Sequence, residues 1–199
     1  MDEESYSSLF NGCDIWIENP YGEDDVGQFS EYILNCTVPM YVPARIVSIR
    51  KNVIHARTVW KPQVLIEDIP LSGIFLRNMN SKDNVAHLVH TSMPELVHQI
   101  YVRYQRELIY TNAGRALLAI NPYRVITNKK GHSIYGAEAI KNHYANKTAS
   151  RHMAPHIFDV AWDAVERQRS NQRNQSILIS GESGSGKSET TKILIQVIY

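Results

Sequence analysis

The stretch QSILISGESGSGKSE, Gln175–Glu189, decides how the second half of the chain is interpreted. Its part Gly181–Ser188 fits the pattern G-x-x-x-x-G-K-[ST] of a phosphate-binding loop. The apolar run Ser176–Ser180 in front of it predicts a buried strand, and the pattern after it, as far as Tyr199, predicts a helix. A strand, a glycine-rich loop and a helix in this order are what the motif requires. The sequence therefore predicts an α/β unit that binds a nucleoside triphosphate.

The residue types in this loop have separate tasks. Glycines let the backbone turn tightly and bring its N–H groups close to phosphate oxygens, and the N-terminus of the following helix adds partial positive charge. Lys187 is expected to reach the β- and γ-phosphates, and the Ser188 hydroxyl is expected to ligate Mg²⁺. The motif thus assigns nucleotide binding to Gly181, Glu182, Ser183, Gly184, Ser185, Gly186, Lys187 and Ser188. The other interpretation is a chance glycine-rich turn before a helix, which the flanking patterns argue against.

Residues 14–76 have a different character and predict a separate β module. Short β-rich runs bounded by turn residues follow one another without a helical pattern between them; they are Asp14–Glu18, Ala44–Arg50, Val53–Val59 and Val64–Ile69. Such a series is typical of a small antiparallel barrel. The acidic, aperiodic residues 1–13 predict a flexible N-terminus. The expected domains are therefore 1–13, 14–76 and 77–199.

Between the β module and the loop, the pattern predicts three helices and one hairpin. Ser92 and Glu95 have the spacing of a helix capping box, with Pro94 pre-setting the first turn. The turn residues around Gly114 predict a hairpin over residues 108–120. A short helix is expected around residues 138–144, and a longer one from Pro155.

The composition excludes several other kinds of protein. The 199 residues carry a formal net charge of +1 and are 43% hydrophobic and 21% charged, so no strong field favours nucleic acid or an acidic membrane. Two cysteines are too few for a disulfide framework. No apolar run approaches the roughly 20 residues of a membrane span, and the acidic start is unlike a signal peptide. We expect a cytoplasmic protein without a transmembrane segment or a nucleic-acid partner.

Several motifs, in a fixed order along the chain, resemble the head of myosins. The loop reads GESGSGKS where myosins usually have GESGAGKT. Segments similar to the family's RY…IYT, AVNPY and PHIF motifs precede it, at Arg103–Thr111, Leu118–Tyr123 and Pro155–Phe158. The β module is similar to the SH3-like subdomain of many myosin heads. The resemblance covers about residues 14–199. It implies an α/β fold: a truncated P-loop NTPase motor core preceded by a small SH3-like β-barrel.

The resemblance also implies a purine-binding loop. Asn121, Pro122 and Tyr135 correspond to the family's positions, where the tyrosine lies near adenine. The interval between Asn121 and Tyr135 is longer than usual, and Asn128–His132 looks like an insertion. Two interpretations of Tyr135 therefore stay open: a contact to adenine, or packing against the next helix.

For function, the resemblance implies an actin-activated ATPase in the complete protein, with ATP and Mg²⁺ as cofactors. Actin filaments would bind through downstream regions, and the setting would be the cytoplasmic cytoskeleton, in a myosin complex. Any light chains would bind outside this segment. The family's switch I and switch II lie downstream of the loop, and only eleven residues follow Ser188. We therefore assign no catalytic residue, and we expect the chain to be inactive as an ATPase by itself.

Two other functions fit parts of the sequence. A different P-loop NTPase, such as a small kinase, would need a recognisable acidic magnesium partner after the loop, and no residue after Ser188 in this chain fits that role. A non-catalytic interaction module would use the β module and keep the loop as a vestige. Nucleotide binding separates this last interpretation from the others.

Overall fold

A computed structural model of the chain describes residue 9 and residues 11–20, 40–50, 53–60, 63–128, 131–148 and 153–199. The chain divides into two compact units, which are described separately. The first comprises residues 1–80 and 89–98, and the second comprises residues 81–88 and 99–199. The predicted flexible residues 1–13 lie mostly outside the described residues. The predicted domain boundary at residues 76 and 77 stays a prediction.

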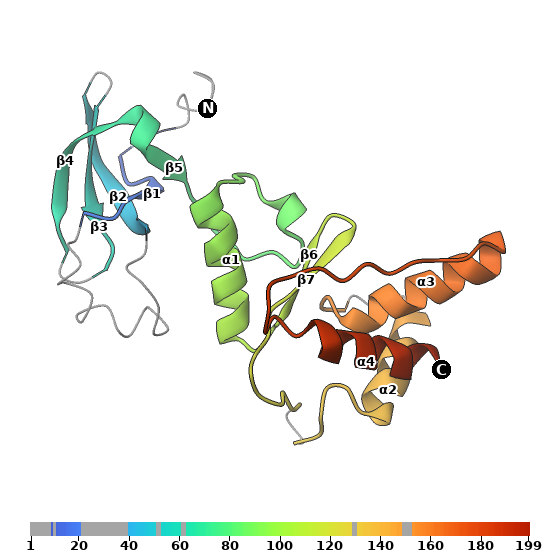
Figure 1. Cartoon of the computed structure of the whole chain (residues 1–199). Helices are drawn as coiled ribbons and strands as arrows, with labels where there is room; N and C mark the ends of the chain where they lie inside the picture. Colours follow the sequence, from blue (N-terminus) through green and yellow to red (C-terminus); the bar gives the residue numbers. More distant parts are fainter. Residues whose placement is uncertain are drawn as a thin grey trace. The chain divides into compact units, whose positions relative to one another are not determined.

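The first unit contains one sheet of five antiparallel strands (Figure 1). The strands are β1 (Asp14–Glu18), β2 (Tyr41–Arg50), β3 (Val53–Thr58), β4 (Leu65–Pro70) and β5 (Ile74–Leu76). Their order in space is β4-β3-β2-β1-β5, so the chain returns after the short helix η3 (Leu71–Gly73) to pair β5 with β1. The four predicted strands are confirmed, and a sheet of this kind fits an SH3-like region.

The core of this sheet is aliphatic and follows the two-residue period over Ala44–Val47 of β2, although three successive residues are buried at Ile15–Ile17 of β1 and at Val42–Ala44 of β2. On β2, Val42, Ala44 and Ile46 are buried, while Arg45 and Val47 are exposed. They pack with isoleucines of the neighbouring strands in one cluster. Full burial of each such isoleucine contributes roughly 1.5–3 kcal/mol, so this cluster holds the sheet together.

Helix α1 (Met93–Gln105) begins in the first unit, but not with the predicted capping box. The hydroxyl of Ser92 is buried and has no hydrogen-bond partner in the described part of the chain. The fully buried carboxylate of Glu95 instead accepts a hydrogen bond from the Trp16 indole at 2.8 Å. A buried carboxylate needs such donors because desolvation is costly. The serine half of the capping box is therefore wrong, and Glu95 is used for a tertiary contact.

The second unit contains the predicted hairpin and helices. Its strands are β6 (Tyr110–Ala113) and β7 (Ala116–Ala119), with Gly114 in the turn at φ 63°. The remaining elements are η4 (Val85–His87), α2 (Ala137–Thr148), α3 (Ile157–Asn171) and α4 (Lys187–Ile198). Helix α2 extends further than the predicted 138–144. Helices α3 and α4 pack against each other (Figure 1).

Arg103, near the end of α1, joins that helix to the hairpin inside the second unit. Its side chain is almost fully buried and pairs with Asp83. The guanidinium also donates to the Thr111 hydroxyl at 2.8 Å and to the Tyr110 carbonyl at 2.7 Å. A planar fork of donors suits such a set of acceptors. Arg103 therefore fixes where β6 starts.

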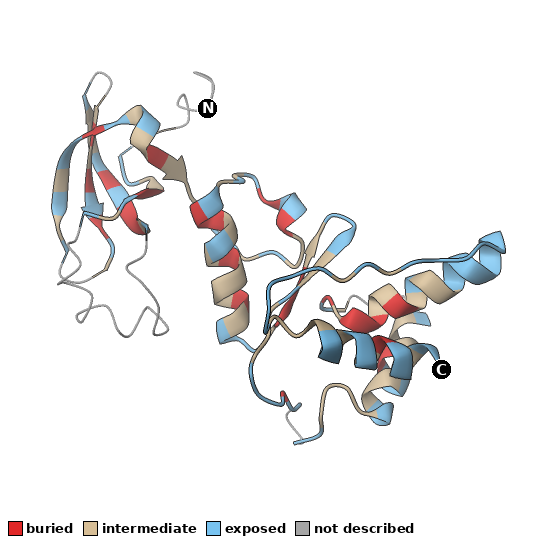
Figure 2. Cartoon of the chain, viewed as in Figure 1, coloured by how far each residue is buried: buried red, intermediate tan, exposed pale blue. Residues whose placement is uncertain are grey.

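The predicted strand Ser176–Ser180 is wrong in this structure. The segment is extended but belongs to no strand, and Figure 2 shows that most of it is exposed. Leu178 is 92% exposed, while Ile177 and Ile179 pack partly on the core of the second unit. A strand needs a neighbour to take its backbone hydrogen bonds, and no strand of the described residues pairs with this segment.

Candidate nucleotide-binding site

The glycine-rich loop leads directly into helix α4. Gly184 and Gly186 have φ of 79° and 94°, values that residues with a Cβ rarely adopt. Gly186 is the N-cap of α4, and its carbonyl accepts from the Thr190 amide at 2.9 Å. The first amides of the helix have no partner within the helix, which makes this end suited to anions.

The ammonium group of Lys187 lies against the loop's own backbone. It donates to the carbonyls of Gly181 and Glu182, each at 2.8 Å. A lysine has three donors, so one remains for a ligand after these two bonds. Ser188 follows in the first turn of α4 and is exposed. The structure thus brings one cation and the start of a helix to the same loop.

The loop is also held by Asn121, which lies 63 positions earlier in the chain. The Asn121 side chain donates to the Gly184 carbonyl at 2.7 Å and accepts from the Tyr123 amide at 2.9 Å. Pro122 lies between Asn121 and Tyr123 in the sequence and is partly exposed. Two of the predicted purine-loop residues, Asn121 and Pro122, are therefore next to the glycine-rich loop.

The proposed insertion before Tyr135 closes on itself. The amide of Asn128 donates to the His132 carbonyl at 2.8 Å, and Thr127 bridges to Ser133 in antiparallel fashion. The Ile134 amide then donates to the Ile126 carbonyl at 3.2 Å. Lys129 and Lys130, within the insertion, lie outside the described residues. The inserted residues thus lie before Ile134, and Ile134 packs against the core of the second unit.

Tyr135 is half-buried and lies among other aromatic side chains. Its hydroxyl is 3.1 Å from the Tyr110 hydroxyl, and its ring centroid is 5.9 Å from that of His156. Burial raises the pKa of Tyr135, so its phenol is protonated near neutral pH. These contacts place the ring but do not decide whether it meets a nucleotide base, so the adenine contact stays a prediction.

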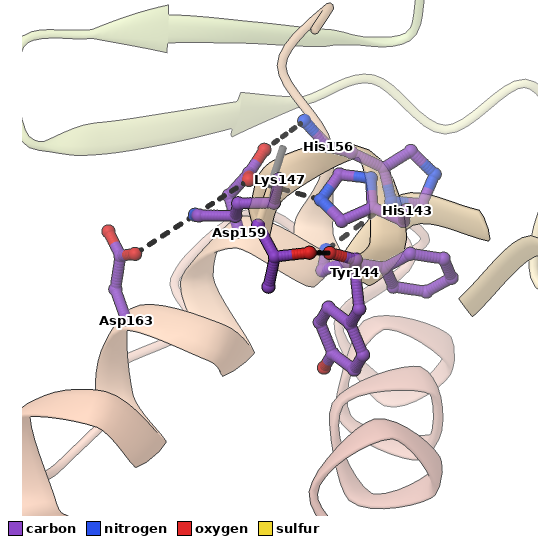
Figure 3. A network of polar contacts seen from close by, with 8 residues as sticks. His143, Tyr144, Lys147, His156, Asp159 and Asp163 are labelled. Atoms are coloured by element: carbon purple, nitrogen blue, oxygen red, sulfur yellow. Dashed lines mark hydrogen bonds and ion pairs between the residues drawn. The ribbon is translucent and has the colours of Figure 1, made fainter. Parts of the chain in front are cut away.

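A polar network joins α2 to α3 (Figure 3). One oxygen of Asp159 contacts Nε2 of His143 at 3.1 Å and accepts from Lys147 at 2.9 Å. Lys147 also reaches Asp163 at 3.0 Å. Burial alone would raise the pKa of Asp159, but the hydrogen bonds from His143 and Lys147 outweigh it and hold the pKa at about 2.

His156 is the N-cap of helix α3 and is held by the carboxylate of Asp159. Its backbone amide donates to Asp159 at 3.2 Å, and its ring accepts from the Phe158 amide at 3.3 Å. Burial, helped by His143 and opposed by Asp159, lowers the pKa of His156 to about 4. This capping box was not predicted, because histidine is not among the usual N-cap residues.

A cavity of about 940 Å³ runs beside the unpaired segment 175–180. Strand β7 and helix α3 line its other sides, and it reaches the loop at Gly181, Ser185 and Lys187. The segment, α3 and the hairpin each contribute more of the lining than the loop does. The candidate nucleotide site is therefore built from the loop and Asn121, and the cavity reaches only its edge.

Sequence reasoning missed two features of the site. Tyr123 is 81% exposed, and a Cβ on Gly184 would lie 3.7 Å from its hydroxyl, so its side chain borders the loop. In the sequence, the pair Asn121-Pro122 is a turn signal that points to this region. Lys147 carries no local signal, since its partners lie on another helix. Within the described residues, no cluster of three or more His, Cys, Asp or Glu side chains is arranged to hold a metal ion.

Comparison with known proteins supplies the family. A family model described as myosin head (motor domain) matches residues 82–199. Myosin-J heavy chain of Dictyostelium discoideum is 40% identical over 131 residues, which cover 64% of this chain and 6% of the relative. Myosin-H heavy chain of the same organism is 34% identical over 157 residues, covering 69% and 8%. Unconventional myosin-VI of Homo sapiens is 34% identical over 131 residues, covering 64% and 10%.

The family match covers more than half of the chain, so the chain belongs to the myosin head family. This confirms the family predicted from the ordered motifs. The matched region spans a tenth or less of the length of these three relatives. In the part of the chain that the structure describes, no helix has the length and apolar character needed to cross a membrane.

Proposed function

We propose that this chain is the ATP-binding portion of a myosin-type, actin-based cytoskeletal motor. The observation that carries the proposal is the geometry of Gly181–Ser188, which joins a lysine ammonium, glycines of positive φ and the start of α4. Anions are stabilised by such a combination because unpaired amides and a fixed cation face them together.

Each loop residue has a role in this proposal. Lys187 keeps two donors on the loop carbonyls and directs the third to the β- and γ-phosphates. The backbone amides of Glu182, Ser183, Gly184 and Gly186 surround the phosphates, while the Ser185 amide closes the loop on the Glu182 carbonyl at 3.2 Å. The Ser188 hydroxyl ligates Mg²⁺. One protein ligand fits this ion, which takes most of its other ligands from phosphate and water. Bound Mg²⁺ would supply charge neutralisation on the phosphate oxygens.

The base lies, in this proposal, against the loop that runs from Asn121 to Tyr135. Asn121 and Pro122 are held at the glycine-rich loop by the bond to Gly184. Tyr135 is the predicted adenine contact. The bond from the Asn128 amide to the His132 carbonyl brings the chain back before Tyr135.

The broader setting follows from membership of the family and is part of the same proposal. Hydrolysis and actin binding would use regions outside this segment, and the location would be the cytoskeleton of the cytoplasm. Residues 14–76 would form the SH3-like module and residues 77–199 the front of the motor. No group in the chain is assigned to hydrolysis.

Binding of a fluorescent ATP analogue to the purified chain tests the proposal. Lys187→Ala should weaken binding roughly tenfold or more, since a hydrogen bond to a charged group contributes about 1.5–3 kcal/mol. Lys192→Ala is the matched control, because Lys192 lies on the same helix and its ion-pair partner is the exposed Glu189. Equal binding by both variants would refute the phosphate site. If a longer protein that contains this chain does not pellet with actin filaments, the proposed motor function is refuted.

The same measurements separate the other candidate functions. ATP binding together with phosphate transfer to a small acceptor, without actin binding, would indicate another P-loop enzyme. No nucleotide binding by a folded chain would indicate an interaction module. Neither candidate is favoured by a specific feature of the described residues.

A further inference from the structure

We propose that Tyr110 is a positioning residue that holds Tyr135 in the orientation in which it meets the nucleotide base. This inference rests on the proposed function, because it takes the loop of residues 121–135 as the base site. It adds a residue that the phosphate-loop motif does not contain.

The first support is the bond between the two hydroxyl groups. Tyr110 is the first residue of β6 and is only 5% exposed. Its hydroxyl lies 3.1 Å from that of Tyr135. A buried phenol without a partner is destabilised, so Tyr110 favours the position of Tyr135 in which the bond is made. Burial raises the pKa of both phenols, so both remain protonated and one donates to the other.

The second support is the rigid setting of Tyr110. Its carbonyl accepts from the buried Arg103 guanidinium at 2.7 Å. Its ring meets His156 edge-on, with centroids 5.0 Å apart. His156 is in turn held by Asp159 through the helix cap, and Asp159 is held by Lys147 (Figure 3). Tyr110 is therefore fixed by strand, helix and polar network.

Tyr135 lies in a different setting. It follows the turn that closes the insertion and stands two residues before α2 begins at Ala137. Its backbone amide donates to the Ser133 side chain at 3.2 Å, which holds the turn but not the ring. The hydroxyl bond to Tyr110 and the packing on His156 therefore set the direction of the ring. Loss of that bond should weaken binding of the base without changing binding of the phosphates.

The test compares two ligands that share phosphates and differ in the base. Affinities of the chain for Mg·ATP and for Mg·tripolyphosphate are measured by calorimetry. Tyr110→Phe should weaken the affinity for Mg·ATP roughly three- to tenfold, which is the usual range for the loss of one hydrogen bond. The affinity for Mg·tripolyphosphate should not change. Tyr104→Phe is the matched control, because Tyr104 borders the same core and should change neither affinity.

A double-mutant cycle sharpens the test. Tyr135→Phe removes the other hydroxyl of the same bond, so it should reproduce Tyr110→Phe, and the double variant should be no weaker than either one. Because Tyr135 is only half-buried, this variant also keeps the test valid if Tyr110→Phe does not fold. Additive losses would overturn the proposal, as would equal losses for both ligands or an unchanged ATP affinity.

The outcomes also distinguish the two proposals. If the unaltered chain binds ATP no more tightly than tripolyphosphate, the base site itself is refuted, and the role of Tyr110 falls with it. If the unaltered chain prefers ATP and Tyr110→Phe keeps the full preference, only the positioning role is refuted.

Discussion

Acid is expected to destabilise the second unit through His156. This side chain caps α3, packs on Tyr110 and Phe158, and has a pKa lowered by burial from 6.5 to about 4. In the unfolded chain the same group titrates near its ordinary pKa. Between these two values the unfolded state binds more protons than the folded state, so stability falls as the pH falls.

The size of the effect follows from the two pKa values. With 6.5 for the unfolded chain and about 4 for the folded one, His156 costs about 2 kcal/mol between about pH 7 and about pH 5. For a unit of this size that corresponds to a fall in Tm of roughly 10 °C. Asp159, whose pKa is held at about 2, loses its stabilising contribution only below about pH 4. The two groups therefore act in separate pH ranges.

Thermal unfolding followed by circular dichroism at several pH values measures this slope. The comparison variant is His156→Asn, which keeps a side chain able to cap a helix and removes the titrating ring. Its stability at neutral pH will differ from that of the unaltered chain, so only the change with pH is compared. His156→Asn should lose most of the fall in Tm between about pH 7 and about pH 5. If the two proteins have the same pH slope, the argument is wrong, and other groups cause the acid sensitivity.

Two further substitutions test the loop and its support. Gly181→Ala would place a Cβ 2.6 Å from the Ser185 hydroxyl and 3.2 Å from its Cβ; it should weaken ATP binding, and adding Ser185→Ala should restore part of it. No recovery in the double variant would show that the hydroxyl is not the obstacle. Arg103→Lys keeps the charge but not the fork that reaches Thr111 and Tyr110; urea unfolding should show a loss of about 3 kcal/mol or more. A loss below about 1 kcal/mol would mean that Arg103 does not organise this region.

Much of the local structure could be predicted from the sequence, because its causes lie within a few residues. The strands of the first unit follow from alternation and turn residues, and the hairpin follows from the turn at Gly114. The phosphate-binding motif could be recognised for the same reason, because its glycines, Lys187 and the start of α4 lie close together in the sequence. Ordered motifs along the chain were enough to predict the myosin head family.

Contacts between distant residues could not be predicted in this way. Nothing near Asn121 indicates Gly184 as the partner of its side chain, and nothing near Tyr110 indicates Tyr135. Likewise, Glu95 has the spacing of a capping residue, yet its carboxylate accepts from Trp16. A side chain with several acceptable partners takes the one that the packing brings within reach, so only the tertiary structure decides it.

The segment 176–180 shows the same division for the backbone. Its apolar and β-branched residues favour an extended, partly buried segment, because such side chains fit a half-buried surface. Whether it becomes a strand depends on a neighbour that takes its backbone hydrogen bonds. None of the described strands pairs with it, and Leu178 is exposed. The sequence by itself predicted a phosphate-binding loop and determined the family, whereas the tertiary structure decided which backbone and side-chain groups have partners, because those partners are distant in the chain.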